Sequence, residues 1–155
     1  NSLKKNSKIP ICIDTEGAQI RTKVKKEKYY RLGQNLKISK LNGNFCLYSE
    51  NVYSQLKIND ILNIGFSNLN LRIINLKNNI LCKVIKNGKL ENNKGIHLQN
   101  RKIKLNYLTK KDFKAIEIGK KFNINYFALS FTNSVSDIIK FNKLLKEMKR
   151  KYPDK

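Results

Sequence analysis

Between residues 20 and 98 the chain repeats one pattern: short segments of aliphatic and β-branched residues, separated by turns of Gly and Asn. The clearest segments are "LKISK", "NFCLYS", "DILNIG", "LNLRIINL" and "NILCKVI". Such segments are typical of strands, and Gly and Asn accept the backbone angles that tight turns need. No amphipathic helix of useful length fits into this stretch. The pattern therefore predicts a small all-β module, a barrel or a sandwich.

The residues on either side of this stretch alternate between strand and helix patterns. Residues 9–14 ("IPICID") indicate a short buried strand, and residues 124–131 ("INYFALSF") indicate a strand buried on both faces. Helices are expected over 109–122 and 134–152, where apolar residues recur at helical spacing. The order strand, β-module, helix, strand, helix predicts an α/β domain into which an all-β module is inserted.

Each predicted helix begins with a capping signature. Thr109 precedes the first helix and Asp112 follows three residues later, while Ser134 and Asp137 repeat this arrangement before the second. In a capping box the two side chains satisfy backbone N–H groups at the helix start. Apolar residues on one face of each helix are expected to meet a core: Phe113, Ile116 and Phe122 in the first, and Ile138, Phe141, Leu145 and Met148 in the second.

The chain is thus expected to have three parts: residues 1–18 as a strand of the α/β domain, 19–98 as the inserted β-barrel, and 99–155 as the continuation of the α/β domain. In a (β/α)8 barrel the chemistry lies at the carboxyl ends of the strands, and an insertion after a strand can close over that end as a lid. Asp14 and Thr15 directly follow the first predicted strand. An active site is therefore expected at this strand end.

The strong positive charge raises the question of nucleic-acid binding. The formal net charge is +22, from 33 Lys and Arg against 11 Asp and Glu. The basic residues are spread over the whole chain, whereas phosphate and base recognition favours Arg with interleaved aromatic residues. A basic nucleic-acid-binding β-module is therefore the weaker alternative, and we expect only salt-sensitive, nonspecific binding. Most of the positive charge is Lys, since arginine occurs only at Arg21, Arg31, Arg72, Arg101 and Arg150.

The cysteines, the single histidine and the length of the apolar runs limit the class of protein. Cys12, Cys46 and Cys82 form no C-x-x-C pair and lie in apolar runs, so we expect buried thiols in a reducing, cytoplasmic compartment. His97 is the only histidine, which excludes a His-rich metal site. No apolar run approaches the roughly 18 residues of a membrane span, and we expect no secretory signal. The chain begins at Asn1 without an initiator Met, and we expect it to be an excerpt of a longer protein.

Three motifs in the same order resemble the pyruvate kinase family. "IDTEGAQIRT" resembles the family's strand-end motif Asp-Thr-Lys-Gly-Pro-Glu-Ile-Arg-Thr. "VIKNGKLENNKGIHLQNRKIKLNYLTKKD" resembles a stretch with Asn-Gly-Gly, Lys-Gly-Val-Asn-Leu-Pro and Leu-Thr-x-Lys-Asp, and "FALSFTNSVSDI" resembles the Ser-Phe-Val-Arg strand end with its following helix. The spacing agrees across residues 9–140, which is nearly the whole chain but only part of a full-length pyruvate kinase.

The resemblance implies a (β/α)8 barrel in which this chain supplies strand 3, a helix, strand 4 and a helix, with the small β-barrel lid inserted after strand 3. It implies a cytoplasmic, glycolytic phosphotransferase, commonly tetrameric, that uses Mg²⁺ and K⁺ to convert phosphoenolpyruvate and ADP into pyruvate and ATP. By their motif positions, Asp14 and Thr15 would help to bind K⁺, and Arg21 and Lys94 would approach the nucleotide phosphates. No catalytic residue of the family is expected in this chain, so the 155-residue chain alone is expected to be inactive.

Several residues depart from the family's motifs. Glu16 stands where the family usually has Lys, and Asn133 replaces the Arg of Ser-Phe-Val-Arg. The lid turn at Ile64 and Gly65 lacks the acids that many relatives carry there, and Asp60 comes too early to replace them. These departures leave a second function open: a catalytically degenerate pyruvate-kinase-like protein that serves as a binding or regulatory module.

Two further polar residues are weighed against simpler roles. Ser130 follows the second predicted strand and could face the same site as Asp14, but a core or capping role is favoured. His97 occupies a position where the family has Asn, and we expect it to be a surface or hydrogen-bonded structural residue.

Overall fold

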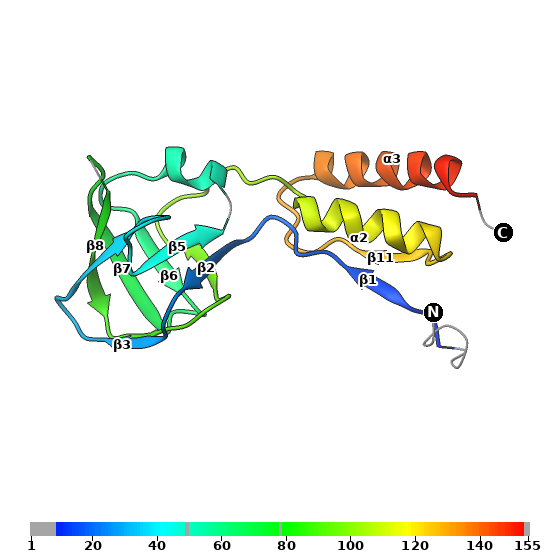
Figure 1. The fold of residues 1–155 in the computed structure, drawn as a ribbon. Helices are drawn as coiled ribbons and strands as arrows, with labels where there is room; N and C mark the ends of the chain where they lie inside the picture. Colours follow the sequence, from blue (N-terminus) through cyan, green and yellow to red (C-terminus); the bar gives the residue numbers. More distant parts are fainter. Residues whose placement is uncertain (1–8, 49, 78, 154–155) are drawn as a thin grey trace. The chain divides into compact units, whose positions relative to one another are not determined.

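The computed structural model describes residues 9–153 apart from 49 and 78. These residues form two compact units (Figure 1). The first, called the α/β unit, contains the residues up to Ala18 and those from Asn106 onward, and the second, called the β unit, is Gln19–Leu105. No helix in this described part of the chain is long and apolar enough to cross a membrane.

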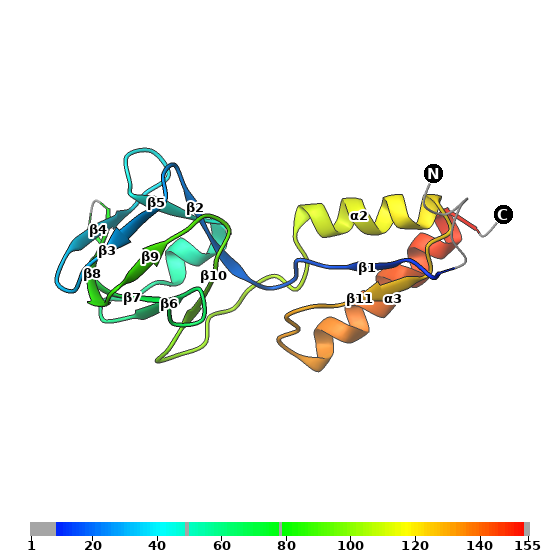
Figure 2. The same ribbon diagram turned by 90° about the horizontal axis from the view of Figure 1, so that it is seen from below.

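The α/β unit consists of two strands and two helices. β1 (Cys12–Asp14) pairs in parallel with β11 (Tyr126–Ala128). α2 (Lys110–Lys121) and α3 (Val135–Lys151) both lie along this strand pair (Figure 2). The predicted alternation of strand and helix is therefore confirmed, although both strands are shorter than the sequence indicates.

The strand pair in the described structure has one covered face. Ile13 and Phe127 face α2 so closely that a Cβ added to Gly119 would lie 2.5 Å from Ile13 Cδ1 and 3.2 Å from the Phe127 ring. Cys12 and Tyr126 alternate with them and are exposed. The expectation that residues 124–131 form a strand buried on both faces is wrong for this chain, and the strand at 9–14 is also exposed on one face.

The helix starts agree with the capping prediction. The Thr109 hydroxyl accepts the N–H of Asp112 at 3.2 Å, and the Asp112 carboxylate accepts the N–H of Thr109 at 2.7 Å. At the start of α3, the Asp137 carboxylate accepts the N–H of Ser134 at 3.1 Å. These contacts satisfy N–H groups that have no partner inside the helix.

The apolar faces of the helices are covered only in part. Ile116 and Phe141 are buried and form the small core of this unit with Leu108. Leu145 and Met148 pack against this core and are partly buried. The other residues predicted to face a core are substantially exposed: Phe113, Phe122 and Ile138.

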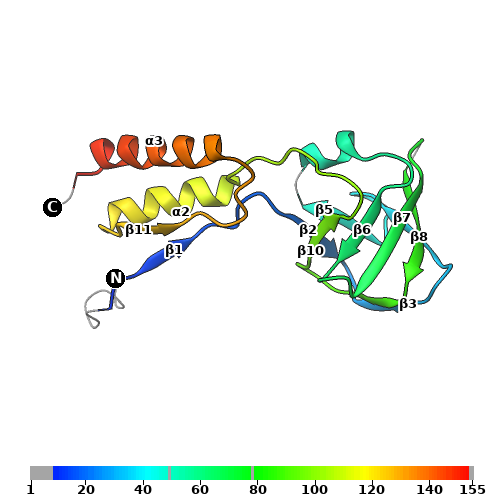
Figure 3. The same cartoon turned by 180° about the vertical axis from the view of Figure 1, so that it is seen from behind.

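The β unit is a closed barrel of seven strands in the order β10-β2-β5-β4-β8-β7-β6 (Figure 3). The barrel closes because β10 pairs with both β2 and β6. All five segments that the sequence singled out contain a strand, and the predicted all-β module is confirmed. The strands are β2 (Ile20–Val24), β4 (Asn35–Ile38), β5 (Phe45–Tyr48), β6 (Ile61–Ile64), β7 (Leu69–Asn75), β8 (Ile80–Lys86) and β10 (Gly95–Leu98).

Three shorter elements of the β unit have no counterpart in the sequence prediction. β3 (Lys28–Tyr30) and β9 (Gly88–Leu90) form a separate two-stranded antiparallel sheet. A 3-10 helix, η1 (Glu50–Gln55), follows β5. Their brevity explains the omission, since three to six residues carry too little periodicity to distinguish a strand from a loop.

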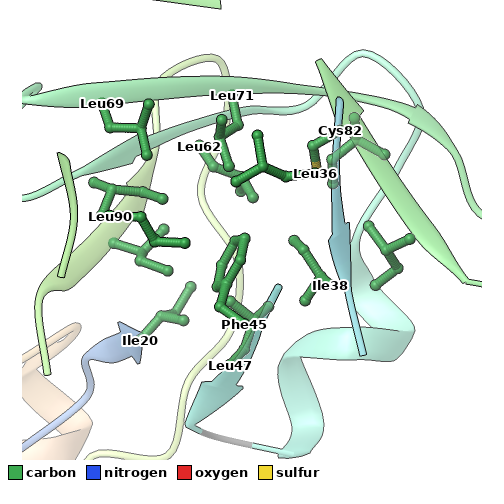
Figure 4. Packing of buried hydrophobic residues seen from close by; sticks show 14 of the residues in the cluster. Ile20, Leu36, Ile38, Phe45, Leu47, Leu62, Leu69, Leu71, Cys82 and Leu90 are labelled. Carbon is green, nitrogen blue, oxygen red and sulfur yellow. The ribbon is translucent and has the colours of Figure 1, made fainter. Parts of the chain in front are cut away.

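Alternation of side chains along the strands builds the barrel core (Figure 4). In β7, Leu69, Leu71 and Ile73 are fully buried, whereas Arg72 between them is exposed. This period of two is the geometry of a strand with one buried face. The completely buried side chains of the barrel include Leu36, Leu62, Leu69, Leu71, Ile73, Cys82, Leu90 and Val52.

The segment that follows β10 is bound to the barrel by two side chains. Arg101 donates from Nε to Asp60 Oδ1 at 2.8 Å and from Nη2 to Asp60 Oδ2 at 2.6 Å, and Nη2 also contacts the carbonyl oxygen of Gln55. The Gln55 side chain exchanges two hydrogen bonds with the Lys104 backbone, at 2.8 and 2.9 Å. The structure therefore divides the chain later than the expected boundary after residue 98.

We expect the Asp60–Arg101 pair to make barrel stability depend on pH. Burial by itself raises the pKa of the Asp60 carboxyl, but hydrogen bonds from Arg101 and from the Lys57 N–H outweigh burial and hold this pKa below its ordinary 3.8. A lowered folded-state pKa stabilises the fold above pH 3.8, and this contribution is lost as the pH falls through the lower folded-state value.

Asp60→Asn should therefore lower the free energy of unfolding at neutral pH by about 1.5–3 kcal/mol, the range for hydrogen bonds to charged groups. The gap between the variant and the natural protein should close in acid. Urea titrations followed by the NMR signals of the barrel test this. Glu27→Gln removes an exposed acid of the same unit and should have a much smaller effect. A gap that stays constant at low pH would contradict the assignment.

The three thiols differ in burial, which corrects the expectation that all are buried. Cys82 is buried in the barrel, Cys46 is intermediate and Cys12 is exposed. Burial raises the pKa of the Cys82 thiol to about 12. The thiolate is the reactive form, so at pH 8 only about one Cys82 in ten thousand is reactive even before shielding is considered.

Iodoacetamide at pH 8 should thus label Cys12 in the native protein and label Cys82 only after unfolding. Peptide mass spectrometry at successive times measures both rates, with urea-unfolded protein as the control in which all three thiols react. Equal labelling of Cys12 and Cys82 in the folded protein would mean that the barrel opens readily.

Candidate functional site

The carboxyl ends of β1 and β11 bring three polar side chains together in the α/β unit. Ser130 Oγ donates to Asp14 Oδ1 at 2.5 Å, and the Ser130 N–H donates to Thr15 Oγ1 at 3.0 Å. The Thr15 N–H donates to the Ala128 carbonyl oxygen at 3.0 Å, which extends the parallel pairing beyond β1. Asp14 is exposed, while Thr15 is buried. One carboxylate and two hydroxyl groups therefore meet at one edge of the strand pair.

Ser130 takes a larger part in this cluster than a core or capping role would give it. The turn after β1 passes so near its carbonyl oxygen that a Cβ on Gly17 would lie 2.0 Å away. Gly17 also has a φ of 65°, a conformation that favours glycine. Gly17 therefore permits the close approach that brings Asp14 and Thr15 beside Ser130.

A buried carboxylate holds this turn in place. Asp112, which is 3% exposed, accepts the backbone N–H of Glu16 at 2.7 Å and that of Gly17 at 3.3 Å. The same carboxylate accepts the N–H of Thr109 as the helix cap of α2. One side chain thus joins the turn after β1 to the start of α2. The sequence identified Asp112 only as a capping residue, since nothing local indicates a contact with a residue so far away along the chain.

The charge of Glu16 is offset by a neighbouring lysine. Lys111 Nζ lies 3.1 Å from Glu16 Oε1. Lys111 belongs to the first turn of α2, next to the Asp112 that holds the turn after β1. Glu16 places a negative charge where the family usually has a lysine, and Lys111 of α2 supplies a positive charge beside it.

Arg21 and Lys94 lie on adjacent chain segments of the β unit. Arg21 pairs across β2 and β10 with Gly95, the residue after Lys94. Thr22, the residue after Arg21, binds the backbone of Lys94. Its N–H donates to the Lys94 carbonyl oxygen at 2.9 Å, and its hydroxyl accepts the Lys94 N–H at 2.8 Å. The Thr22 hydroxyl donates to the Glu91 carbonyl at 2.7 Å. Thr22 is buried and fixes the backbone that carries Lys94.

Both cationic side chains have weak local partners. Arg21 Nη1 donates to the Asn93 carbonyl oxygen at 3.1 Å, and Lys94 Nζ lies 3.7 Å from Glu91 Oε2. The Lys94 and Glu91 side chains are 45% and 26% exposed. Exposed ion pairs of this length contribute little to stability. We call Arg21, Asn93 and Lys94 the cationic rim.

The structure thus groups the four predicted site residues into two clusters. Asp14 and Thr15 belong to the strand-end cluster of the α/β unit, and Arg21 and Lys94 belong to the cationic rim of the β unit. The sequence analysis did not identify Thr22 as a site residue. Its position directly after Arg21 in the motif could have indicated a supporting role.

Other acidic and histidine residues have structural contacts. Asp60 is committed to Arg101, and His97 Nε2 lies 3.2 Å from the Asn63 side-chain nitrogen, as expected for a structural histidine. Within residues 9–153, leaving aside 49 and 78, no three His, Cys, Asp or Glu side chains form a group that could hold a metal ion.

The sequence model of the family described as "Pyruvate kinase, barrel domain" matches residues 1–152. The chain belongs to the pyruvate kinase family. The resemblance carried by the three motifs is confirmed.

Curated relatives agree with this assignment. The pyruvate kinases of Staphylococcus aureus strains USA300 and NCTC 8325 / PS 47 are each 27% identical to this chain over 151 residues. Each match covers 91% of this chain and 26% of the relative. The chain therefore spans about a quarter of the length of these pyruvate kinases.

Solved structures share the fold. A crystal structure of Cryptosporidium parvum pyruvate kinase matches with a TM-score of 0.81 at 23% identity, over 96% of this chain and 33% of that one. A second structure of a pyruvate kinase from the same organism has a TM-score of 0.70 at 23% identity, over 98% of this chain and 33% of that one.

Asp112 accepts backbone N–H groups from both the turn after β1 and the start of α2, so its removal should loosen both segments. In Asp112→Ala, the amides of Glu16, Gly17 and Thr109 lose their acceptor and should exchange hydrogen about 5- to 150-fold faster, as expected for losing about 1–3 kcal/mol of local stability. Amide exchange by NMR measures this directly.

Asp137→Ala is the matched control, because Asp137 performs the same capping role at α3. It should accelerate the amides of Asn133 and Ser134, whose N–H groups it accepts, and leave Glu16 and Gly17 unchanged. Unchanged exchange at Glu16 and Gly17 in Asp112→Ala would show that the turn is held by other contacts.

Proposed function

We propose that this chain is the lid and two neighbouring strand–helix units of a (β/α)8 pyruvate kinase, which in its full-length form transfers the phosphoryl group of phosphoenolpyruvate to ADP. The observation that carries the proposal is the strand-end cluster. Asp14, Thr15 and Ser130 meet at the carboxyl ends of two adjacent parallel strands, where the active sites of such barrels lie. Membership of the family supplies the reaction class.

The chemistry of the strand-end cluster fits a hard monovalent cation. The Asp14 carboxylate is exposed, and hydroxyl oxygens can accept two contacts each, so Thr15 retains acceptor capacity beside its bond from Ser130. Oxygen donors of this kind suit K⁺. Asp14 and Thr15 would hold the ion, which supplies positive charge near an anionic substrate. The described residues contain no group of three His, Cys, Asp or Glu side chains that could hold a metal ion, and the proposal places the Mg²⁺ ligands elsewhere in the full-length protein.

The cationic rim would bind the phosphates of ADP. Arg21 offers a fixed planar donor, and Lys94 offers a mobile point charge on a backbone that Thr22 holds. Phosphoryl transfer depends mainly on positioning and on neutralisation of charge, which such residues provide. Because no catalytic residue is assigned to this chain, we expect the 155-residue chain by itself to show no turnover. We expect the full-length protein to be cytoplasmic and to form homotetramers, as the family resemblance implies.

One observation favours the degenerate binding module as the second candidate. The turn between β6 and β7 carries Gly65, Phe66 and Ser67 and no carboxylate, whereas many relatives have acids in the lid turn. Glu16 is a weaker argument for loss of activity, because Lys111 offsets its charge. An active pyruvate kinase and a degenerate binding module would both bind phosphate groups, but only the active enzyme would show turnover.

A coupled pyruvate-formation assay on the full-length protein tests the proposal. Phosphoenolpyruvate, ADP and Mg²⁺ should give turnover with K⁺ and little with Na⁺ alone. Asp14→Asn should raise the K⁺ concentration for half-maximal rate by roughly tenfold or more, as expected for a weakened ligand set. Lys94→Met should raise KM for ADP, while Lys86→Met, which removes an exposed lysine elsewhere on the barrel, should not.

Turnover that is independent of K⁺, or unchanged by Asp14→Asn, would contradict the role of the strand-end cluster. Absence of turnover from a folded full-length protein that still binds ADP would favour the binding module.

A further inference from the structure

The turn between β6 and β7 has an unusual backbone. Gly65, Phe66 and Ser67 have φ angles of 60°, 58° and 67°. Residues with side chains rarely adopt this left-handed region, and a bulky residue such as Phe is among the least suited to it. Two consecutive non-glycine residues in this conformation need surrounding contacts that impose it.

Those contacts are present at both ends of the turn. The Asn68 N–H donates to the Ile64 carbonyl at 3.0 Å, and the Gly65 N–H donates to the Gly95 carbonyl at 2.9 Å. The Asn68 carbonyl packs so tightly on Gly88 that an added Cβ would lie 2.0 Å away. The turn is therefore a fixed support and not a loose loop end.

This support presents an uncovered aromatic ring. Phe66 is 98% exposed, more than any other large apolar residue of the described chain. A single exposed apolar residue is common on protein surfaces and carries no argument alone. Here full exposure coincides with a backbone conformation that Phe disfavours, and both features are imposed by a well-fixed turn.

The turn adjoins the cationic rim. A Cβ added to Gly65 would lie 3.9 Å from both Cβ and Cδ of Lys94, so the Lys94 stem runs past the residue that precedes Phe66. Gly95, which accepts the Gly65 N–H, pairs with Arg21 across β10 and β2. The exposed ring and the two cations thus belong to one connected patch of the β unit.

We propose that Phe66 is a stacking surface for the base of a nucleoside diphosphate whose phosphates are bound by Arg21 and Lys94. An exposed aromatic ring on the turn next to the Lys94 stem, with Arg21 on the paired strand, matches a ligand with a heterocyclic ring at one end and phosphates at the other. Every base has a π-face, so this contact favours nucleotides over inorganic phosphates without strong preference among bases. The inference rests on the proposed phosphate role of the cationic rim and adds a residue that recognises the base.

Binding to the 155-residue chain can be followed by NMR titration with ADP and, separately, with pyrophosphate, which lacks base and ribose. The natural chain should bind ADP about five- to tenfold more tightly than pyrophosphate, the lower part of the range for one stacked base. Phe66→Ala should remove this difference and leave pyrophosphate affinity unchanged. Saturation of the Phe66 ring protons should transfer to the adenine protons of bound ADP.

Matched variants separate the ring from its surroundings. Phe66→Tyr keeps an aromatic face and should retain the preference for ADP, whereas Phe66→Leu keeps only apolar bulk and should lose it. Tyr29→Ala removes another exposed ring of the β unit and should change neither affinity. Because Phe66 is almost fully exposed, its replacements should leave the remaining amide signals in place, which the same spectra report.

The outcomes distinguish this inference from the function on which it rests. Equal affinity of the natural chain for ADP and pyrophosphate, or equal weakening of both by Phe66→Ala, overturns the stacking role and leaves the cationic rim intact. Failure of pyrophosphate to bind, or binding that Lys94→Met does not weaken, overturns the phosphate role of the rim and the stacking proposal together.

Discussion

The strand-end cluster depends on one buried carboxylate. Asp112 accepts the N–H groups of Glu16, Gly17 and Thr109, and so links the turn after β1 to the first turn of α2. A carboxylate that accepts several backbone N–H groups is strongly held, and the groups it orders are held with it. The position of Asp14 beside Ser130 follows from this turn, because Gly17 must approach the Ser130 carbonyl oxygen closely.

Closure of the barrel brings the residues of the cationic rim together. β10 pairs with β2 on one side and with β6 on the other, which places Lys94, Arg21 and the turn containing Phe66 on neighbouring segments. Thr22 then fixes the backbone around Lys94 while the side chain stays exposed. A fixed backbone with a mobile charged end suits a residue that binds phosphate and releases it.

Local sequence pattern and long-range packing determine different features of this chain. Strands with a clear period of two, and helices that begin at Thr109 and Ser134, were predicted from local pattern because propensity and capping act within a few residues. Exposure was predicted less well. Cys12 and Ile138 have the pattern of buried residues, but burial depends on which neighbours cover an element, and the two helices cover only one face of the strand pair.

The sequence by itself determined the all-β character of residues 20–98, the alternation of strand and helix around it, and the motif that carries Asp14, Thr15 and Arg21, since each is encoded over a short stretch. Only the tertiary structure decided that Asp112 holds the turn after β1 and that Ser130 binds Asp14. Those contacts join residues about a hundred positions apart, and their geometry exists only after strands and helices have packed.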